Sequence, residues 1–130
     1  MEEATTSPKP YIIRALYEWI VDNRLTPHIA VNVNCFGVVA PKSHAKNGTL
    51  ILNISSSSVA HLLIGNDAIE FKARFGGVSH NIFIPITAIT SIYARENNQG
   101  MEFEITEETA QAQQSKKVPK FNVISGNKTE

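Results

Sequence analysis

Residues Asn66 to Gly77 read NDAIEFKARFGG, and the rest of the predicted fold is built around them. Between Ile69 and Phe75, apolar and charged side chains alternate strictly, which is the pattern of a strand with one buried face. Ala73 is a small residue between two phenylalanines, so it leaves a depression in the apolar row. Gly76-Gly77 then permits a sharp turn or a close backbone approach. We expect this strand to form one wall of a groove, although an ordinary core strand followed by a turn would give the same pattern.

Length and charge restrict the class of protein. A chain of 130 residues with 42% hydrophobic content matches one domain with tails. Lys+Arg and Asp+Glu are balanced at 12 each, so nucleic acid and anionic membranes are not favoured partners. Cys35 is the single cysteine, which excludes an internal disulfide and fits a reducing compartment. The N-terminus has no apolar signal region and no run approaches about 18 apolar residues, so we expect a soluble cytoplasmic protein.

The N-terminal part predicts one helix that is apolar almost all round. Ser7 is the expected N-cap, Pro8 and Pro10 are tolerated in the first turn, and the helix should end near Asn23. Its only polar stripe is made by Arg14, Glu18 and Asp22. We expect Ile12, Leu16, Trp19 and Ile20 to pack on the domain, which leaves Tyr11, Ala15 and Tyr17 as uncovered apolar surface. A second subunit crossing on a two-fold axis would cover this surface, whereas a helix buried wholly in its own domain is the alternative.

After Thr26-Pro27 the chain has the alternation of short strands. They are expected at 28–33, 36–40, 49–54, 59–64, 69–75, 79–86, 91–96 and 101–105. Asn47-Gly48 should make a tight turn, residues 55–58 a polar connector, and residues 97–100 the turn of a last hairpin. Pro85 suggests a strand end or a sheet edge. The sum is an α+β fold, mostly β, with an N-terminal helix and a small antiparallel sandwich or partly open barrel.

The C-terminal tail changes character twice. Residues 106–117 lack bulky apolar side chains and are expected to be disordered. The compact cluster Val118-Pro119-Lys120-Phe121-Asn122-Val123-Ile124 follows, and residues 125–130 are polar again. A short apolar motif after such a segment is typical of a docking peptide, but it also arises by chance.

Residue sets for catalysis or metal binding are not recognisable in the sequence. The histidines at 28, 44, 61 and 80 lack the spacing of metal ligands, and Cys35 has no motif that links it to a histidine. The serines at 55–58 lack the strand-turn-helix setting of a nucleophile elbow, and Gly76-Gly77 is not a phosphate loop. We therefore predict a protein that is not an enzyme and needs no cofactor or metal.

The chain resembles the stringent starvation protein B (SspB) family over residues 10–105. The matching residues occur in the family's order and spacing: Pro10-Tyr11, Arg14-Ala15, Glu18-Trp19, Asp22-Asn23, Leu25-Thr26-Pro27-His28, Gly48, Leu52-Asn53, Asn66-Asp67, Phe71, Ala73-Arg74-Phe75-Gly76-Gly77 and Ile92-Tyr93-Ala94-Arg95-Glu96-Asn97. Members of this family are adaptors that deliver ssrA-tagged polypeptides to the ClpXP protease, as part of protein quality control. The resemblance implies a non-catalytic domain with two small sheets, which dimerises through its helix and holds a tag peptide in a groove.

The resemblance also implies roles for particular residues. The groove would be formed by Ser58, Val59, Phe71, Ala73, Arg74 and Asn81, and the homodimer contact by Tyr11, Ala15, Glu18 and Trp19. The domain would span residues 10–105 after a flexible N-terminus at 1–9. The tail 106–130 would dock on the ClpX unfoldase through Val118, Pro119, Lys120, Phe121, Val123 and Ile124. Six residues follow Ile124 here, whereas the family's tail usually ends at its docking motif.

A second function remains open from the residues alone. Small β-barrels often bind RNA or single-stranded nucleic acid through strand aromatics beside cations, and Phe71, Phe75 and Tyr93 lie near Lys72, Arg74 and Arg95 in the sequence. The zero net charge and the absence of a basic run within the fold weigh against this alternative.

Overall fold

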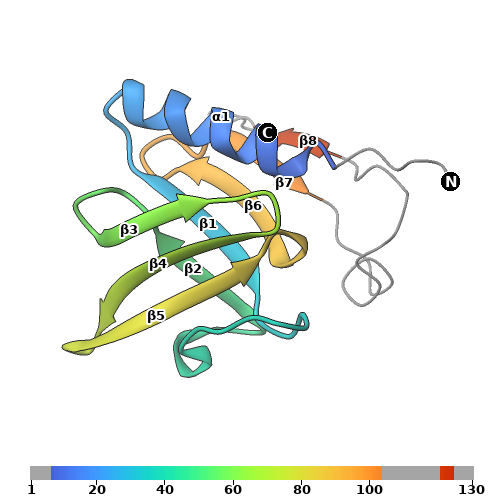
Figure 1. Ribbon diagram of the computed structural model, residues 1–130. Coiled ribbons are helices and arrows are strands. Elements are labelled where there is room, and N and C mark those ends of the chain that lie inside the picture. The colour runs from blue at the N-terminus through green and yellow to red at the C-terminus, as the bar shows by residue number, and fades with distance from the viewer. Residues whose placement is uncertain (1–6, 104–120, 125–130) are drawn as a thin grey trace, which may run out of the picture.

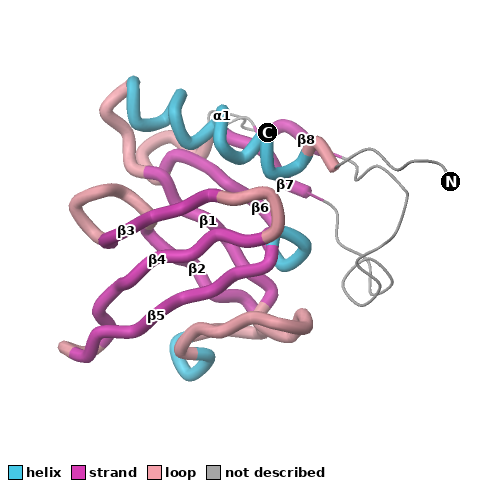
Figure 2. The backbone as a smooth tube through the Cα atoms, in the orientation of Figure 1, coloured by secondary structure: helices cyan, strands magenta, loops and turns pink. Residues whose placement is uncertain are grey.

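The fold is an α+β sandwich of one helix and two antiparallel sheets, as predicted, and it is not closed into a barrel (Figures 1 and 2). The computed structural model describes residues 7–103 and 121–124. Its elements are α1 (Lys9–Asp22), β1 (Pro27–Asn32), β2 (Thr49–Asn53), β3 (Val59–Ile64), β4 (Ala68–Phe75), β5 (Val78–Pro85), β6 (Ile89–Ala94), β7 (Gly100–Phe103) and β8 (Phe121–Ile124), with short 3₁₀ turns at Lys42–His44 and Ile86–Ala88. The expected segments 1–6, 106–117 and 118–120 lie outside the described residues.

The two sheets differ in size and in their edges. The larger sheet has the order β2-β1-β6-β7-β8, and the smaller has the order β3-β4-β5. In Figure 1 the smaller sheet, green to yellow, lies in front of β1, β2 and β6, while α1 runs along one side of the sandwich. Every strand pair is antiparallel, and β4 pairs with β5 over all eight of its residues, from Ala68↔Pro85 to Phe75↔Val78. Pro85 therefore ends an edge strand, as its missing N–H predicts.

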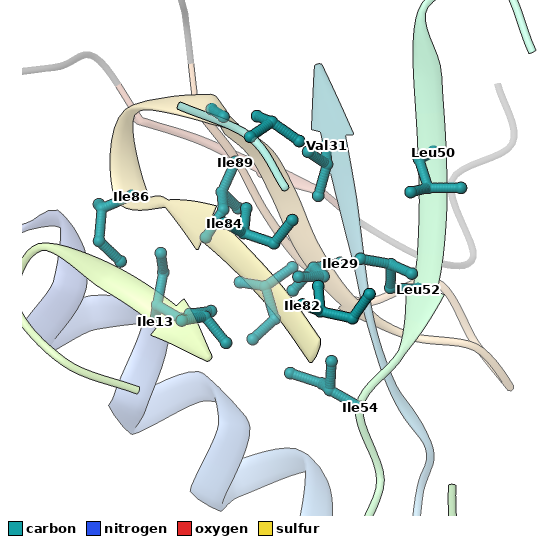
Figure 3. Close-up of a cluster of buried hydrophobic side chains, with 14 of the residues drawn as sticks. Ile13, Ile29, Val31, Leu50, Leu52, Ile54, Ile82, Ile84, Ile86 and Ile89 are labelled. Carbon is teal, nitrogen blue, oxygen red and sulfur yellow. The ribbon is translucent and has the colours of Figure 1, made fainter. Parts of the chain in front are cut away.

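Isoleucine dominates the core between the sheets (Figure 3). The inner faces contribute Ile29 and Ile92 from the larger sheet and Ile69 and Ile84 from the smaller sheet, all fully buried. Each such side chain stabilises the fold by about 1.5–3 kcal/mol relative to an exposed one. The alternation of the β4 sequence is confirmed, since Ile69 and Phe71 are buried while Glu70 and Lys72 are exposed.

The helix begins and packs differently from the prediction. Pro8 rather than Ser7 is the cap residue, and the Ser7 hydroxyl accepts a hydrogen bond from the Lys9 N–H at 3.2 Å. The expected packing of Ile20 is confirmed, whereas that of Trp19 was wrong. Ile13, which was not predicted to pack, lies seven residues from Ile20 and therefore on the same face, and both are fully buried. Trp19 lies off this face and is 40% exposed.

The remaining helix residues separate into a packed side and an open side. Ile12, Leu16 and Tyr17 are partly buried against the core, so Tyr17 does not belong to the uncovered surface. Tyr11 and Ala15 are exposed, as expected.

The first turn of α1 is tied to the larger sheet through a buried lysine. Lys9 is 4% exposed, and its ammonium lies 5.0 Å from the centre of the Phe103 ring at the end of β7. Burial lowers the pKa of this lysine to about 8. The cation–π contact offsets part of the cost of burying the charge.

The predicted strand at 36–40 was wrong. Residues 33–48 form a long loop with turns at 33–37. Of the expected strand 36–40, only Val39 makes a bridge, and it exchanges backbone hydrogen bonds of 2.8 and 2.9 Å with Phe83. Gly37 has a φ of +91°, which breaks an extended chain, and Phe36 is 78% exposed. The tight turn at Asn47-Gly48 is confirmed, because both residues have positive φ and Lys46 bridges Thr49.

The start of β1 and the end of β6 are joined by one carboxylate. Glu96 accepts hydrogen bonds from the Thr26 hydroxyl at 2.6 Å and from the Thr26 N–H at 2.8 Å. These donors hold the pKa of Glu96 below its usual range. A carboxyl whose pKa is lowered by folding stabilises the protein above its unfolded pKa, and that contribution is lost as the pH falls through the folded value.

We therefore predict that Glu96→Gln lowers the melting temperature at neutral pH, and that the difference from the wild type shrinks as the pH falls from about 5 to 3. Melting curves across this pH range measure the effect. Glu70→Gln, on the exposed face of β4, is the matched charge control. A melting difference for Glu96→Gln that stays constant over the whole pH range contradicts the assignment.

Candidate functional site

A groove of about 300 Å³ lies between the edge of the larger sheet and the central strand of the smaller one. Its lining comes from β2, from the connector after it and from β4: Ile51, Leu52, Asn53, Ser58, Phe71, Ala73, Arg74 and Phe75. The volume is at the small end for ligand pockets, which typically measure about 300–1,000 Å³. The groove can therefore hold a few side chains rather than a large cofactor.

The floor and one end of the groove are apolar and held in place by packing. Phe71 is 4% exposed and belongs to the core. The Phe75 ring contacts two histidine rings, with centroid distances of 5.6 Å to His80 and 5.2 Å to His44. Ala73 between these phenylalanines keeps the depression that its small side chain predicts.

The connector after β2 is ordered by its own serines. The Asn53 side-chain oxygen accepts a hydrogen bond from the Ser55 N–H at 2.9 Å, and the Ser55 hydroxyl donates to the Ser58 hydroxyl at 3.2 Å. The N–H groups of Ser58 and Val59 both donate to the Ser55 carbonyl. This local network fixes Ser58 at the groove.

Arg74 lies at the rim rather than on the floor. The alternation of β4 turns its side chain to the exposed face with Glu70 and Lys72, and its guanidinium donates to the Gly77 carbonyl at 3.4 Å. Gly76 and Gly77 have φ values of +60° and +82°, so this turn needs glycine for its backbone conformation. An added Cβ would meet open space at both positions, so the glycines make the turn and do not admit a close backbone.

The structure brings four of the six predicted groove residues together: Ser58, Phe71, Ala73 and Arg74. Val59 is next to the groove, because it pairs with Ala73, but its side chain packs partly on the core. Asn81 lies on β5, where it pairs with Lys72 of β4. Its side chain is exposed and does not line the groove.

Sequence reasoning missed the residues that β2 contributes. Leu50 and Leu52 are buried, and in the alternation of a strand Ile51 and Asn53 then lie on the other face. An isoleucine on an outward face, here 47% exposed, was the available signal. Nothing in the sequence brings Ile51 and Ala73 to the same groove, because that depends on how the two sheets pack.

The backbone of β2 offers a further means of contact. In an antiparallel pair, opposed residues alternate between those that hydrogen-bond to each other and those that do not. The Ile54 N–H donates to the Pro27 carbonyl and the Val33 N–H donates to the Gly48 carbonyl, so every second residue from Gly48 to Ile54, along β2, bonds to β1. Within that alternation the N–H and C=O groups of Ile51 and Asn53 point away from β1. Because β2 is the outermost strand of the larger sheet, these groups lie on an edge to which an extended peptide can add.

The other candidate residues are distributed as follows. Tyr11, Ala15, Glu18 and Trp19 share the exposed side of α1. Arg14 stacks on Tyr11, with its guanidinium carbon 4.6 Å from the ring centre, and donates to the Ile64 carbonyl at 3.0 Å. Of the docking cluster, Phe121–Ile124 forms β8.

The groove's polar side chains are those of Asn53, Ser58 and Arg74, which form no acid–base pair. Within residues 7–103 and 121–124, no group of three His, Cys, Asp or Glu residues could hold a metal ion. Over the same residues, no helix has the length and apolarity required to cross a membrane. The arrangement is suited to binding an extended chain with small and apolar side chains.

Comparison with known proteins identifies the family. The model of the family described as "Stringent starvation protein B" matches residues 7–129. The chain belongs to the stringent starvation protein B family. It is similar to the stringent starvation protein B homolog of Haemophilus influenzae, with 44% identity over 104 residues, which cover 80% of this chain and 69% of that protein. The SspB resemblance predicted from the sequence is thereby confirmed.

Proposed function

We propose that this SspB-family chain is a non-catalytic cytoplasmic adaptor that binds ssrA-tagged polypeptides and delivers them to the ClpXP protease. The observation that carries the proposal is the groove between the free edge of β2 and the Phe71–Phe75 segment of β4, in a chain of this family. An extended peptide fits this groove because one wall offers main-chain groups and the other offers a small apolar depression.

The groove divides binding between two kinds of contact. Ile51, Phe71 and Phe75 would receive small apolar side chains of the tag, with Ala73 leaving the space for them. Arg74 at the rim is a planar cation that can exchange its long contact to Gly77 for a tag carboxylate or carbonyl. The apolar contacts would supply most of the affinity, and Arg74 would help to fix the direction and register of the peptide.

Arg74→Gln is predicted to weaken binding of an ssrA-type peptide by about 1–3 kcal/mol, the range for a lost charge-assisted hydrogen bond. The melting temperature should stay nearly unchanged, because Arg74 is exposed. Titration calorimetry and a melting curve measure the two quantities. Lys72→Gln, which removes a neighbouring cation on the same exposed face, is the control and should leave peptide binding intact. If Arg74→Gln reduces stability and binding alike, Arg74 is a structural residue.

The exposed side of α1 is the proposed homodimer contact. Tyr11 and Trp19 are 48% and 40% exposed, and Ala15 between them would let a second helix approach closely. A two-fold contact needs only this one self-complementary patch. Glu18 would lie at its polar margin.

The variant Tyr11→Lys with Ala15→Glu is therefore expected to be a folded monomer by light scattering, because each new charge is placed in the helix contact. Lys42→Glu with Lys46→Glu, on the loop before β2, is a charge-changing control that should remain dimeric. A double variant on α1 that is still dimeric would show that the subunits meet elsewhere.

Delivery would depend on the C-terminal cluster. Deletion of Val118–Glu130 is predicted to leave tag binding unchanged while abolishing stimulation of tagged-substrate degradation at low substrate concentration, because tethering to the unfoldase raises the effective substrate concentration. Replacing Phe121, Val123 and Ile124 with Ser should have the same effect. Deletion of residues 125–130 alone is the control and should have little effect.

Degradation rates with purified ClpXP and a tagged substrate measure this. If the chain without Val118–Glu130 stimulates degradation as well as the full chain, delivery uses the folded domain instead.

A further inference from the structure

Residues 121–124 form β8, the edge strand of the larger sheet next to β7. β8 pairs antiparallel with β7 in the register Gly100↔Ile124, Met101↔Val123, Glu102↔Asn122 and Phe103↔Phe121 (Figure 1). The outer strand of the larger sheet is thus built from residues 121–124, far from β7 in the sequence. Sequence reasoning expected this segment to be a docking peptide and gave no sign that it pairs.

The edge of β7 has main-chain groups that the rest of the sheet does not use. The Ala94 N–H of β6 donates to the Gln99 carbonyl at 2.9 Å. Every second opposed pair along β6 and β7 is hydrogen-bonded, so Met101, two residues after Gln99, directs its N–H and C=O groups toward β6. The N–H and C=O groups of Gly100 and Glu102 then face β8, opposite Ile124 and Asn122. Without β8 these groups would form an open sheet edge, which readily pairs with another strand.

The position of β7 is itself firmly set. A Cβ added at Gly100 would lie 2.0 Å from the Ile92 carbonyl oxygen, so β7 lies directly against β6 at this point. Phe103 at the other end is 2% exposed and lies beneath the Lys9 ammonium. The edge that β8 meets is therefore a rigid part of the folded domain.

We propose that the outer edge of β7 is an internal binding site for the docking segment, and that this pairing withholds the segment from the unfoldase. The inference rests on the proposed function, since it regulates the same delivery step. Residues 121–124 cannot donate their main-chain groups to β7 and present a free strand to a partner at the same time. The adaptor thus exists in a latched state, with β8 paired, and a released state that docks.

The small size of the pair makes the latch reversible. It joins two strands of four residues at the edge of the sheet, and only two positions on β7 direct their main-chain groups to β8. Short edge pairings open at much lower free energy than the core of a domain. Docking to the unfoldase can therefore compete with the pairing.

A disulfide between β7 and β8 tests the proposal. Glu102 and Asn122 are directly opposite in a hydrogen-bonded position, where Cα atoms are about 5.5 Å apart, within the range a disulfide bridges. Glu102→Cys with Asn122→Cys alters neither the groove nor the apolar docking residues. The native Cys35 is only 5% exposed, so it should not compete during oxidation. The two single-cysteine variants, treated with the same oxidant, are the matched controls.

We expect the oxidised double variant to bind the ssrA-type peptide within about twofold of the wild type and to lose at least tenfold of its stimulation of ClpXP degradation. Reduction should restore stimulation, and the single variants should respond to neither treatment. The proposal is overturned if the disulfide does not form, or if the oxidised and reduced forms stimulate equally.

The outcome also separates the latch from the adaptor role. A reduced chain that fails to bind the tag peptide overturns the adaptor function itself. A reduced chain that binds the tag but does not stimulate degradation shows that residues 121–124 do not dock, which overturns the latch and leaves tag capture standing.

Discussion

Two isoleucine-rich sheet faces pack against each other, and this packing holds the helix, the groove and both sheet edges in place. Ile29 and Ile92 on one side meet the layer of Ile69 and Ile84 on the other, and α1 adds Ile13 and Ile20 to the same cluster. The branched side chains suit strands and fill the space between sheets without polar atoms that need partners. Removing one of them to alanine in such a core typically costs about 2–5 kcal/mol.

This packing leaves the sandwich open along its edges, and the proposed functions use two of them. β2 ends the larger sheet on one side, and its outward backbone meets β4 across the groove. β7 lies toward the other side, where β8 completes the sheet. An edge strand is a hazard in an isolated domain because it recruits other strands. In this chain the main-chain groups at these edges would bind the tag peptide at β2 and residues 121–124 at β7.

The parts of the structure that could be predicted are those that local patterns encode. The alternation at 69–75 gave β4 and its buried face, the paired glycines gave the turn with positive φ, and Pro85 marked the end of an edge strand. Of the residues that line the groove, Ser58 of the connector and Phe71, Ala73 and Arg74 of β4 were predicted. The SspB resemblance supplied the family, which the comparisons confirm.

The errors arise where long-range packing overrides local pattern. Phe36–Ala40 has strand-like residues, but Gly37 turns the chain, and only Val39 reaches a partner. Trp19 is apolar, yet the helix face is set by Ile13 and Ile20. The contributions of Ile51 to the groove and of residues 121–124 to the larger sheet depend on neighbours distant in sequence. Single-sequence patterns do not contain these pairings.

We propose that the groove between β2 and β4 binds a peptide and not a phosphate backbone. The direct measurement is a titration of the full chain with an ssrA-type peptide and with a single-stranded oligonucleotide, each at two salt concentrations. Our account predicts saturable binding of the peptide with an affinity that changes little with salt, and no comparable binding of the oligonucleotide. Binding of the oligonucleotide that weakens steeply as salt rises, with no binding of the peptide, would contradict it.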